Sequence, residues 1–255
     1  MTQTSPDAPT EFILATDLDG TFAGGSAADR VRLQRALASL EDSRLIYVTG
    51  RTVAAARDLI ESVPLPQPAV LIADVGTTVA HGSTFEAVAE LTAELERAWP
   101  GGDRVRRRLA ATPGIEEQAV RAPRRVSYWL QGPSMERVLV EMAQRLAGLE
   151  VDLVGSAGTY IDVIPGGVNK GTTLVRVLRW LGAPLESVVV AGDTLNDLAL
   201  FETGLRGVVV GNCEAALRER LAGRDHLYFA AGAGAAGIAE GLLHFGCLKE
   251  LGDGE

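Results

Sequence analysis

Two aspartates, Asp17 and Asp19, stand one residue apart directly after the apolar run of residues 12–16. This run predicts a buried strand that delivers both carboxylates to its carboxyl end, where open α/β sheets place their sites. One carboxylate can then act as the nucleophile of a phosphoryl transfer, while the other moves a proton. Taken alone, Asp-x-Asp-Gly also occurs in turns and calcium-binding loops, so these alternatives remain open at this point.

The segment Thr49-Gly50 offers a second set of polar groups after an apolar run, residues 45–48. The Thr49 hydroxyl and the backbone at Gly50 suit hydrogen bonds to a phosphate oxygen, although a threonine in this place also caps helices. Lys170 is one of two lysines in a chain with many arginines, and it opens a predicted helix. Its compact ammonium suits a crowded phosphate site better than a guanidinium does, and a solvated lysine is the alternative.

Two carboxylates and an amide, those of Asp193, Asp197 and Asn196, follow the most apolar predicted strand, residues 188–191. Mg²⁺ prefers oxygen ligands and commonly uses one or two carboxylates together with phosphate and water. We expect Asp193 to bind the metal directly, and Asp197 to hold a metal-bound water or Lys170. The sequence therefore predicts a magnesium site next to a phosphate site.

Strands and helices alternate in both halves of the chain but not in its middle. Apolar runs at residues 12–16 and 45–48 are each followed by a helical pattern, and the same rhythm resumes after Lys170. Continuous apolar runs favour a parallel sheet covered on both faces. In between, longer polar helices and alternating strands predict an inserted α+β unit. We therefore predict an α/β fold, with a Rossmann-like core of residues 1–82 and 166–255 and an inserted cap of residues 83–165.

The composition is that of a soluble globular protein of 255 residues, with 47% hydrophobic and 22% charged residues. The formal net charge of -9 disfavours binding to nucleic acid or anionic lipid and favours a small-molecule ligand. Two cysteines are too few for a disulfide framework, and neither a signal peptide nor a transmembrane helix is predicted. We expect a cytoplasmic monomer or small homo-oligomer without a membrane or nucleic-acid partner.

The four polar segments, taken together and in this order, resemble the motifs of the haloacid dehalogenase superfamily. The resemblance implies that Asp17 is the nucleophile, whereas Asp19 is the acid/base and binds metal through its backbone carbonyl. It also implies that Thr49 and Lys170 hold the phosphoryl group. The dehalogenase branch lacks the second aspartate, so its presence argues for phosphate chemistry. The predicted phosphate-binding set is Thr49, Gly50, Lys170 and Asn196, and the predicted Mg²⁺ ligands are Asp17, Asp19, Asp193 and Asp197.

Several phrases, for example residues 55–59 and 169–171, extend the similarity to sucrose-phosphatase-like sugar-phosphate phosphatases. An insert at this place in the chain looks like the C2B-type cap of that group, which implies a sugar-phosphate substrate. Thr159 and Tyr160 stand where the cap loop of sucrose phosphatases shows Lys-Asp, and Thr78 stands where they show Glu. The cap residues that we expect to contact the sugar are Tyr128, Ser156, Thr159 and Tyr160.

The sequence thus predicts a Mg²⁺-dependent phosphatase that hydrolyses a sugar phosphate through an aspartyl-phosphate on Asp17. Sucrose phosphate, a glucosyl- or mannosyl-glycerate phosphate, an amino-sugar phosphate and a cyclitol phosphate remain open as substrates. Two alternatives use the same scaffold, a phosphotransferase or mutase and a non-catalytic sugar-phosphate sensor. Arginines of the predicted cap form a solvated helix face or grip an anionic group of the substrate. They are Arg104, Arg106, Arg107, Arg108, Arg121, Arg124 and Arg125.

Overall fold

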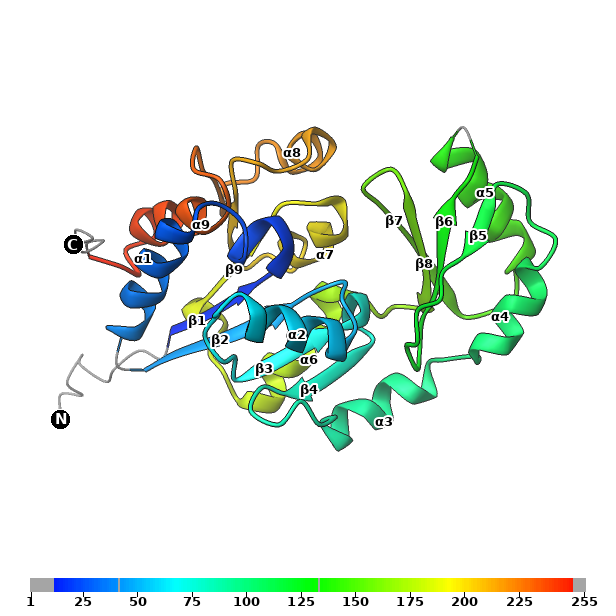
Figure 1. The fold of residues 1–255 in the computed structure, drawn as a ribbon, viewed down its shortest axis with the longest axis horizontal. Coiled ribbons are helices and arrows are strands. Elements are labelled where there is room, and N and C mark those ends of the chain that lie inside the picture. The colour runs from blue at the N-terminus through cyan, green and yellow to red at the C-terminus, as the bar shows by residue number, and fades with distance from the viewer. Residues whose placement is uncertain (1–11, 41, 133, 250–255) are drawn as a thin grey trace, which may run out of the picture.

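The computed structural model describes residues 12–40, 42–132 and 134–249 and contains two sheets, each with its own helices (Figure 1). The larger sheet has seven strands in the order β11-β10-β9-β1-β2-β3-β4. Neighbouring strands run parallel except at one edge, where β4 is antiparallel to β3. The strands are β1 (Phe12–Thr16), β2 (Ser43–Val48), β3 (Val70–Ala73), β4 (Thr78–His81), β9 (Val188–Gly192), β10 (Arg206–Val209) and β11 (Leu227–Phe229).

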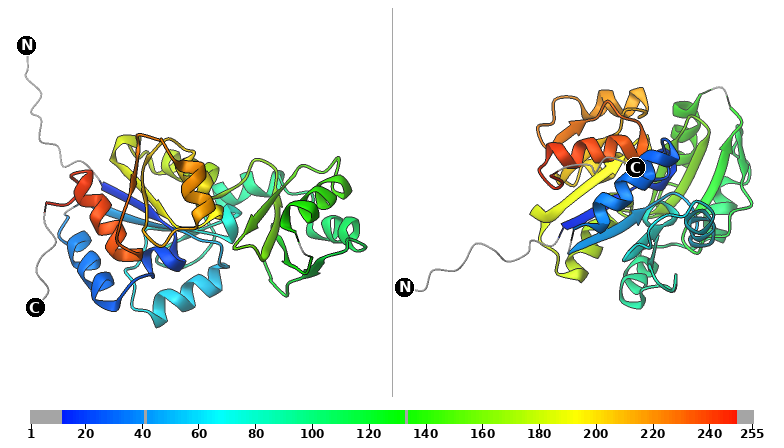
Figure 2. Two further views of the ribbon diagram at one scale, coloured as in Figure 1. Left: turned by 90° about the horizontal axis from the view of Figure 1, so that it is seen from above. Right: turned by 60° about the vertical axis from the view of Figure 1, so that its left-hand side comes forward.

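Helices cover both faces of the larger sheet, as its continuous apolar strands require. Leu14 and Leu71 pack on one face with α1, α2 and α9, whereas Ile13 and Ile72 pack on the other with α3, α6, α7 and α8. Figure 2 shows this layering from two further directions. The helices are α1 (Ala27–Ala38), α2 (Val53–Ser62), α3 (Ala89–Arg97), α6 (Lys170–Leu181), α7 (Leu198–Phe201), α8 (Ala215–Leu221) and α9 (Gly234–His244), with short turns at Leu18–Phe22, Asp74–Gly76, Leu185–Ser187 and Leu195–Asp197.

The smaller sheet has four antiparallel strands in the order β5-β6-β8-β7 and lies at one end of the larger sheet (Figure 1). Side chains such as Val126, Ile161 and Val163 form an apolar cluster with Val105 and Met142 of its two helices. The sheet therefore buries one face against its own helices and leaves the other for the larger sheet. Its elements are α4 (Gly102–Leu109), β5 (Ile115–Glu117), β6 (Val126–Leu130), α5 (Met135–Arg145), β7 (Val151–Ser156) and β8 (Tyr160–Pro165).

The predicted α/β fold with an inserted α+β unit is confirmed, because β5 to β8 lie between β4 and α6 in the chain and form a sheet of their own. The first helix after the predicted boundary, α3, nevertheless buries Leu91 and Leu95 in the same cluster as the strands of the larger sheet. The division into residues 1–82 with 166–255 and residues 83–165 stays a prediction. No helix within the described ranges combines the length and apolarity that crossing a membrane requires.

Candidate active site

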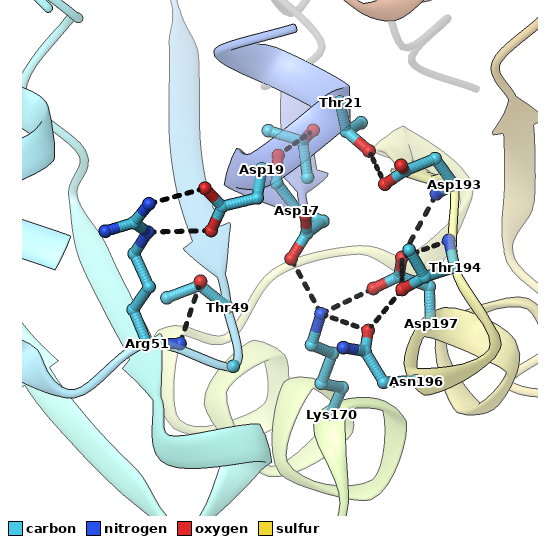
Figure 3. Close-up of polar contacts among 12 residues, drawn as sticks. Asp17, Asp19, Thr21, Thr49, Arg51, Lys170, Asp193, Thr194, Asn196 and Asp197 are labelled. Atoms are coloured by element: carbon cyan, nitrogen blue, oxygen red, sulfur yellow. Dashed lines mark hydrogen bonds and ion pairs between the residues drawn. The ribbon is translucent and has the colours of Figure 1, made fainter. Parts of the chain in front are cut away.

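The polar segments of the sequence meet at one edge of the larger sheet. Strands β9, β1 and β2 are parallel neighbours, so the residues that follow them, Asp193, Asp17 and Thr49, emerge side by side. The chain leaves β1 toward β2 on one side, while β9 lies on the other, which is the kind of switch point where open α/β sheets bind ligands. Lys170, the first residue of α6, enters the same place from below the sheet edge in the view of Figure 3.

Lys170 is fully buried and is surrounded by acceptors. Its Nζ donates hydrogen bonds to Asp17 Oδ1 at 2.7 Å, to Asn196 Oδ1 at 2.8 Å and to Asp197 Oδ1 at 2.5 Å (Figure 3). Burial alone would lower the pKa of Lys170, but the carboxylates of Asp17 and Asp197 outweigh it and hold that pKa above its ordinary value. The Lys170 ammonium therefore places a positive charge directly beside Asp17.

Asp17 is also buried, and burial raises its pKa well above the ordinary value, although the Lys170 ammonium opposes that shift. Nearby Asp197 and Asp193 raise the pKa of Asp17 further. Because all of these carboxylates crowd around a single ammonium, the cluster favours a further positive charge. A cation bound beside Asp17 would favour the ionised form, which is the nucleophilic one.

The segment from Asp193 to Asp197 is held rigidly by its own hydrogen bonds. The backbone N–H groups of Asp193 and Thr194 both donate to Asp197 Oδ2 at 3.0 Å. Asp193 Oδ1 in turn accepts a hydrogen bond of 2.6 Å from the hydroxyl of Thr21. Burial raises the pKa of Asp193 to about 6, while the Thr21 hydrogen bond opposes the shift and Asp197 adds to it. The turn thus presents two carboxylates to the site at defined positions.

These carboxylates fit a divalent cation. Asp17, Asp193 and Asp197 are buried, and each offers an oxygen within 4.8 Å of the others. Clustered carboxylate oxygens in a buried site are the ligand chemistry of a hard ion such as Mg²⁺. The side chain of Asp19 is not a member of this cluster. That Asp19 binds the metal through its backbone carbonyl stays a prediction.

Asp19 instead forms a two-pronged ion pair with Arg51. Arg51 Nε and Nη2 donate to the two carboxylate oxygens of Asp19 at 2.7 Å each (Figure 3). Both side chains are partly exposed to the cavity beside them. The backbone N–H of Arg51 donates to Thr49 Oγ1 at 3.1 Å, which ties the loop of residues 49–51 together. Arg51 has no predicted role of its own, although it directly follows Thr49 and Gly50 in the sequence.

A cavity of about 770 Å³ opens between the edge of the larger sheet and the smaller sheet. Of the predicted sugar-contacting residues, Ser156 and Tyr160 line it. The structure does not bring Tyr128 and Thr159 to the cavity wall: Tyr128 is buried in the cluster with the helices of the smaller sheet, and Thr159 is exposed in the turn before β8. Tyr128 lies one position before Trp129, which pairs with Tyr160, so strand alternation turns Tyr128 to the opposite face.

The same alternation accounts for a residue that sequence reasoning missed. Asp162 stands two positions after Tyr160 on β8, hence on the same face, and it lines the cavity. Among the predicted cap arginines, Arg121 and Arg125 also line the cavity, whereas Arg106 on α4 pairs with Glu117 at 2.7 Å. The predicted phosphate ligands divide similarly. Gly50 and Asn196 line the cavity, whereas Thr49 and Lys170 are fully buried.

The larger parallel sheet with an inserted antiparallel sheet is the fold of subclass IIB of the haloacid dehalogenase superfamily, and the aspartate cluster lies at the carboxyl edge of the larger sheet. Proteins similar to this chain include sugar phosphatases, that is, phosphoric monoester hydrolases. The model of the sucrose-6F-phosphate phosphohydrolase family matches residues 10–246, and the chain belongs to that family.

Three relatives describe the similarity further. The chain is 37% identical, over 94% of its length, to glucosylglycerol-phosphate synthase of Pseudomonas anguilliseptica, but it spans only 32% of that protein. It is 33% identical to mannosylfructose-phosphate phosphatase of Agrobacterium fabrum, covering 92% of this chain and 96% of the relative. The crystal structure of the sucrose-phosphatase from Synechocystis sp. PCC6803, in complex with sucrose and phosphate, superposes with a TM-score of 0.86 at 27% identity and covers 93% of this chain and 98% of that one.

Proposed function

We propose that this chain is a Mg²⁺-dependent phosphatase that hydrolyses a glycosyl phosphate through an aspartyl-phosphate formed on Asp17. The strongest support is the position of the Asp17 carboxylate, which lines the cavity, lies 2.7 Å from the Lys170 ammonium and is grouped with Asp193 and Asp197. Positive charge held around a nucleophile stabilises the negative charge of a phosphoryl group under attack.

The reaction has two halves. In the first, a carboxylate oxygen of Asp17 attacks phosphorus, the bond from phosphorus to the sugar oxygen breaks, and Asp19 gives that oxygen a proton. In the second, Asp19 takes a proton from a water whose oxygen attacks the same phosphorus, and inorganic phosphate leaves Asp17. Since Arg51 holds the Asp19 carboxylate in an ion pair, that pair has to open and Asp19 has to take up a proton from solvent before it can protonate the leaving oxygen.

The remaining residues bind and orient the phosphate. The Lys170 ammonium, with the hydroxyl of Thr49, the backbone of Gly50 and the amide of Asn196, would hold the phosphoryl oxygens. Mg²⁺ held by the aspartates, with Asp19 contributing its backbone carbonyl, would neutralise the charge of the phosphate.

The cavity suits a substrate with a sugar unit beyond the phosphate. Its volume of about 770 Å³ lies in the range of about 300–1,000 Å³ that is usual for small-molecule sites. The wall from the smaller sheet combines hydroxyl, aromatic and charged groups, those of Ser156, Tyr160, Asp162 and Arg121. Two of the three relatives are named for a glycoside phosphate, and the third was crystallised with sucrose and phosphate. The preferred substrate is therefore a sucrose phosphate, a mannosylfructose phosphate or a glucosylglycerol phosphate. Glucosyl- and mannosyl-phosphoglycerate, amino-sugar and cyclitol phosphates belong in the same screen.

The test is release of inorganic phosphate from a panel of these compounds with Mg²⁺ present. The wild-type chain should hydrolyse at least one of them, and Asp17→Asn should hydrolyse none while still binding inorganic phosphate. A panel on which wild type and Asp17→Asn are equally inert would disprove the proposal. Phosphorus NMR of the products separates hydrolysis from transfer to a second hydroxyl, because a mutase conserves the total phosphate ester.

Three further properties belong to the same proposal. Residues 1–82 and 166–255 would form the catalytic core, and residues 83–165 the cap that selects the sugar. The protein would act in the cytoplasm, as a monomer or a small homo-oligomer. Limited proteolysis would test the boundaries, because cleavage sites concentrate where few contacts cross between domains.

A further inference from the structure

Arg125, which lies directly before β6, bridges the smaller sheet and the phosphate-binding loop of residues 49–51. The side chain is only 7% exposed. Its Nη1 donates a hydrogen bond of 2.7 Å to the backbone carbonyl of Gly50, and its Nη2 lies 3.1 Å from Asp74 Oδ1. On the side of the smaller sheet, Nη1 lies 3.7 Å from Asp162 Oδ1, and Asp162 accepts a hydrogen bond of 2.6 Å from Ser127. One guanidinium thus contacts both parts of the molecule.

The contact with the Gly50 carbonyl orients a peptide group of the phosphate-binding loop. The same planar peptide carries the N–H of Arg51, which donates to Thr49 Oγ1 at 3.1 Å. Fixing the carbonyl end therefore fixes the direction of the N–H end. Because the Thr49 oxygen accepts this bond, its own hydrogen is directed elsewhere and is available to a phosphate oxygen.

The contact with Asp74 supports the same loop from a second side. Asp74 and Val75 have φ angles of 54° and 60°, a left-handed conformation that costs energy in residues other than glycine. Their backbone N–H groups donate to the carbonyls of Arg51 and Thr49 at 2.8 and 3.1 Å. The strained turn thus holds the phosphate-binding loop, and the Arg125 guanidinium forms an ion pair with the carboxylate of the turn.

The cost of this arrangement indicates a function. The Nε of Arg125 is buried and has no hydrogen-bond partner among the residues that the structure describes. Buried donors are usually paired, so the guanidinium lies where its contacts with Gly50 and Asp74 place it rather than where all of its N–H groups are paired. Strained backbone and unsatisfied groups cluster at sites where position matters more than stability.

We propose that Arg125 is a positioning residue: it fixes the conformation of the phosphate-binding loop, through its contacts with Gly50 and Asp74, as long as the smaller sheet is docked on the larger one. The proposal rests on the function proposed above. Arg125 need not touch the phosphate for this role. Displacing the smaller sheet would release the Gly50 carbonyl, and phosphate would then bind less tightly even though the core residues around Asp17 are intact.

Arg124 provides a matched control in the same chain. It is also buried, and it also reaches from the smaller sheet to the larger one, where its Nε donates to the carbonyl of Thr77 at 2.8 Å. Its Nη1 donates to Glu96 Oε2 at 2.8 Å. Neither contact reaches residues 49–51 directly, although Thr77 donates to the backbone carbonyl of Asp74. If phosphate affinity depends only on contacts that join the two sheets, variants at both arginines should lose it equally. If it depends on the proposed role, the loss should be large only for variants at Arg125.

The experiment compares Arg125→Lys, Arg124→Lys and Asp74→Asn with wild type. Titration calorimetry with inorganic phosphate in the presence of Mg²⁺ measures the Kd, and hydrolysis of p-nitrophenyl phosphate, which has no sugar, measures KM and kcat. In Arg125→Lys the forked contact is lost but the charge is kept, so Kd and KM for phosphate groups should rise about 10- to 100-fold. Asp74→Asn should also raise Kd and KM, because it removes the charge that Arg125 contacts in the turn. Asp74 does not line the cavity, so this effect cannot come from direct contact with phosphate. Arg124→Lys should change these values much less, because Arg124 touches neither Gly50 nor the Asp74 carboxylate.

Equal losses of phosphate affinity in Arg124→Lys and Arg125→Lys would overturn the proposal, since bridging alone would then explain both. Weak binding in Arg125→Lys with wild-type binding in Asp74→Asn would also overturn it, because Arg125 would then contact the phosphate itself. If Arg125→Lys is unfolded at the assay temperature, the comparison of Asp74→Asn with Arg124→Lys decides. Failure of the wild-type chain to bind phosphate or hydrolyse any ester would instead refute the proposed function.

Discussion

Replacing Lys170 by methionine should destabilise the protein strongly. The ammonium is fully buried between Asp17 and Asp197, at 2.7 and 2.5 Å, and methionine fills similar space without charge. The substitution leaves two buried carboxylates without their cation, and breaking a buried pair in this way costs about 3–5 kcal/mol. In a protein of this size each kcal/mol lowers Tm by about 2–4 °C. We therefore expect Lys170→Met to unfold roughly 6–20 °C below wild type when divalent cations are absent.

The assay is urea and thermal unfolding of wild type, Lys170→Met, Asp197→Asn and the double variant. Because the two residues share one network, the double variant should lose less than the sum of the single variants, by about 0.5–3 kcal/mol. Lys249→Met is the control, since Lys249 is the other lysine of the chain and is exposed. Added Mg²⁺ should restore part of the stability of Lys170→Met, because a cation again faces the carboxylates.

Two outcomes would contradict a stabilising role of the buried ammonium. The first is a Lys170→Met variant that unfolds at the same urea concentration as Lys249→Met, which would mean that the buried ammonium contributes nothing net. The second is strict additivity in the double variant, which would mean that Lys170 and Asp197 act independently in spite of their contact.

Further predictions concern pH, the exposed ion pair and the sugar side of the cavity. The pKa of Asp193 is raised from 3.8 to about 6, so between these pH values the folded metal-free protein keeps a proton that the unfolded chain has lost. Its stability should therefore fall as pH rises from about 4 to about 6. Asp193→Asn should flatten this part of a plot of Tm against pH, and an unchanged slope would contradict the assignment. Arg51→Ala should change the free energy of unfolding by only about 0–1 kcal/mol in urea titrations, because the ion pair of Arg51 with Asp19 is partly exposed. The kcat for the sugar phosphate should fall, because the proposed acid/base Asp19 loses the side chain that orients it. A large loss of stability would contradict this role. Tyr160→Ala should raise KM for the sugar phosphate but not for p-nitrophenyl phosphate, because Tyr160 lines the cavity on the side of the smaller sheet. The ring of Tyr160 packs against that of Trp129, with centroids 4.9 Å apart. Equal changes of KM for both substrates would contradict this prediction.

The core of the site could be predicted from the sequence because its signals are local. An apolar run followed by Asp17, and another followed by Asp193, each name a strand and the end from which a side chain emerges. Parallel strands place those ends at the same edge of the sheet, so the convergence of the motifs follows from the fold class. The structure has the strands β1, β2 and β9 at these places, as neighbours in one sheet.

The wall of the smaller sheet could not be predicted to the same depth. Tyr128 and Asp162 are separated in function by which face of a strand they occupy, and the identity of the buried face depends on the helices that pack there. A shift of one position exchanges the two faces of a strand, so the sequence pattern indicates neither that Tyr128 faces the helices nor that Asp162 faces the cavity.

Local patterns of residues therefore predict the chemical groups of the site and the strand ends that carry them. Which groups meet depends on contacts between distant parts of the chain: Lys170 contacts Asp17, and Arg125 contacts the carbonyl of Gly50. Such contacts depend on how the helices and the smaller sheet pack around the strands, and no local pattern of residues records that packing. The nucleophile could be named from its neighbours in sequence, whereas its electrostatic surroundings are a property of the fold.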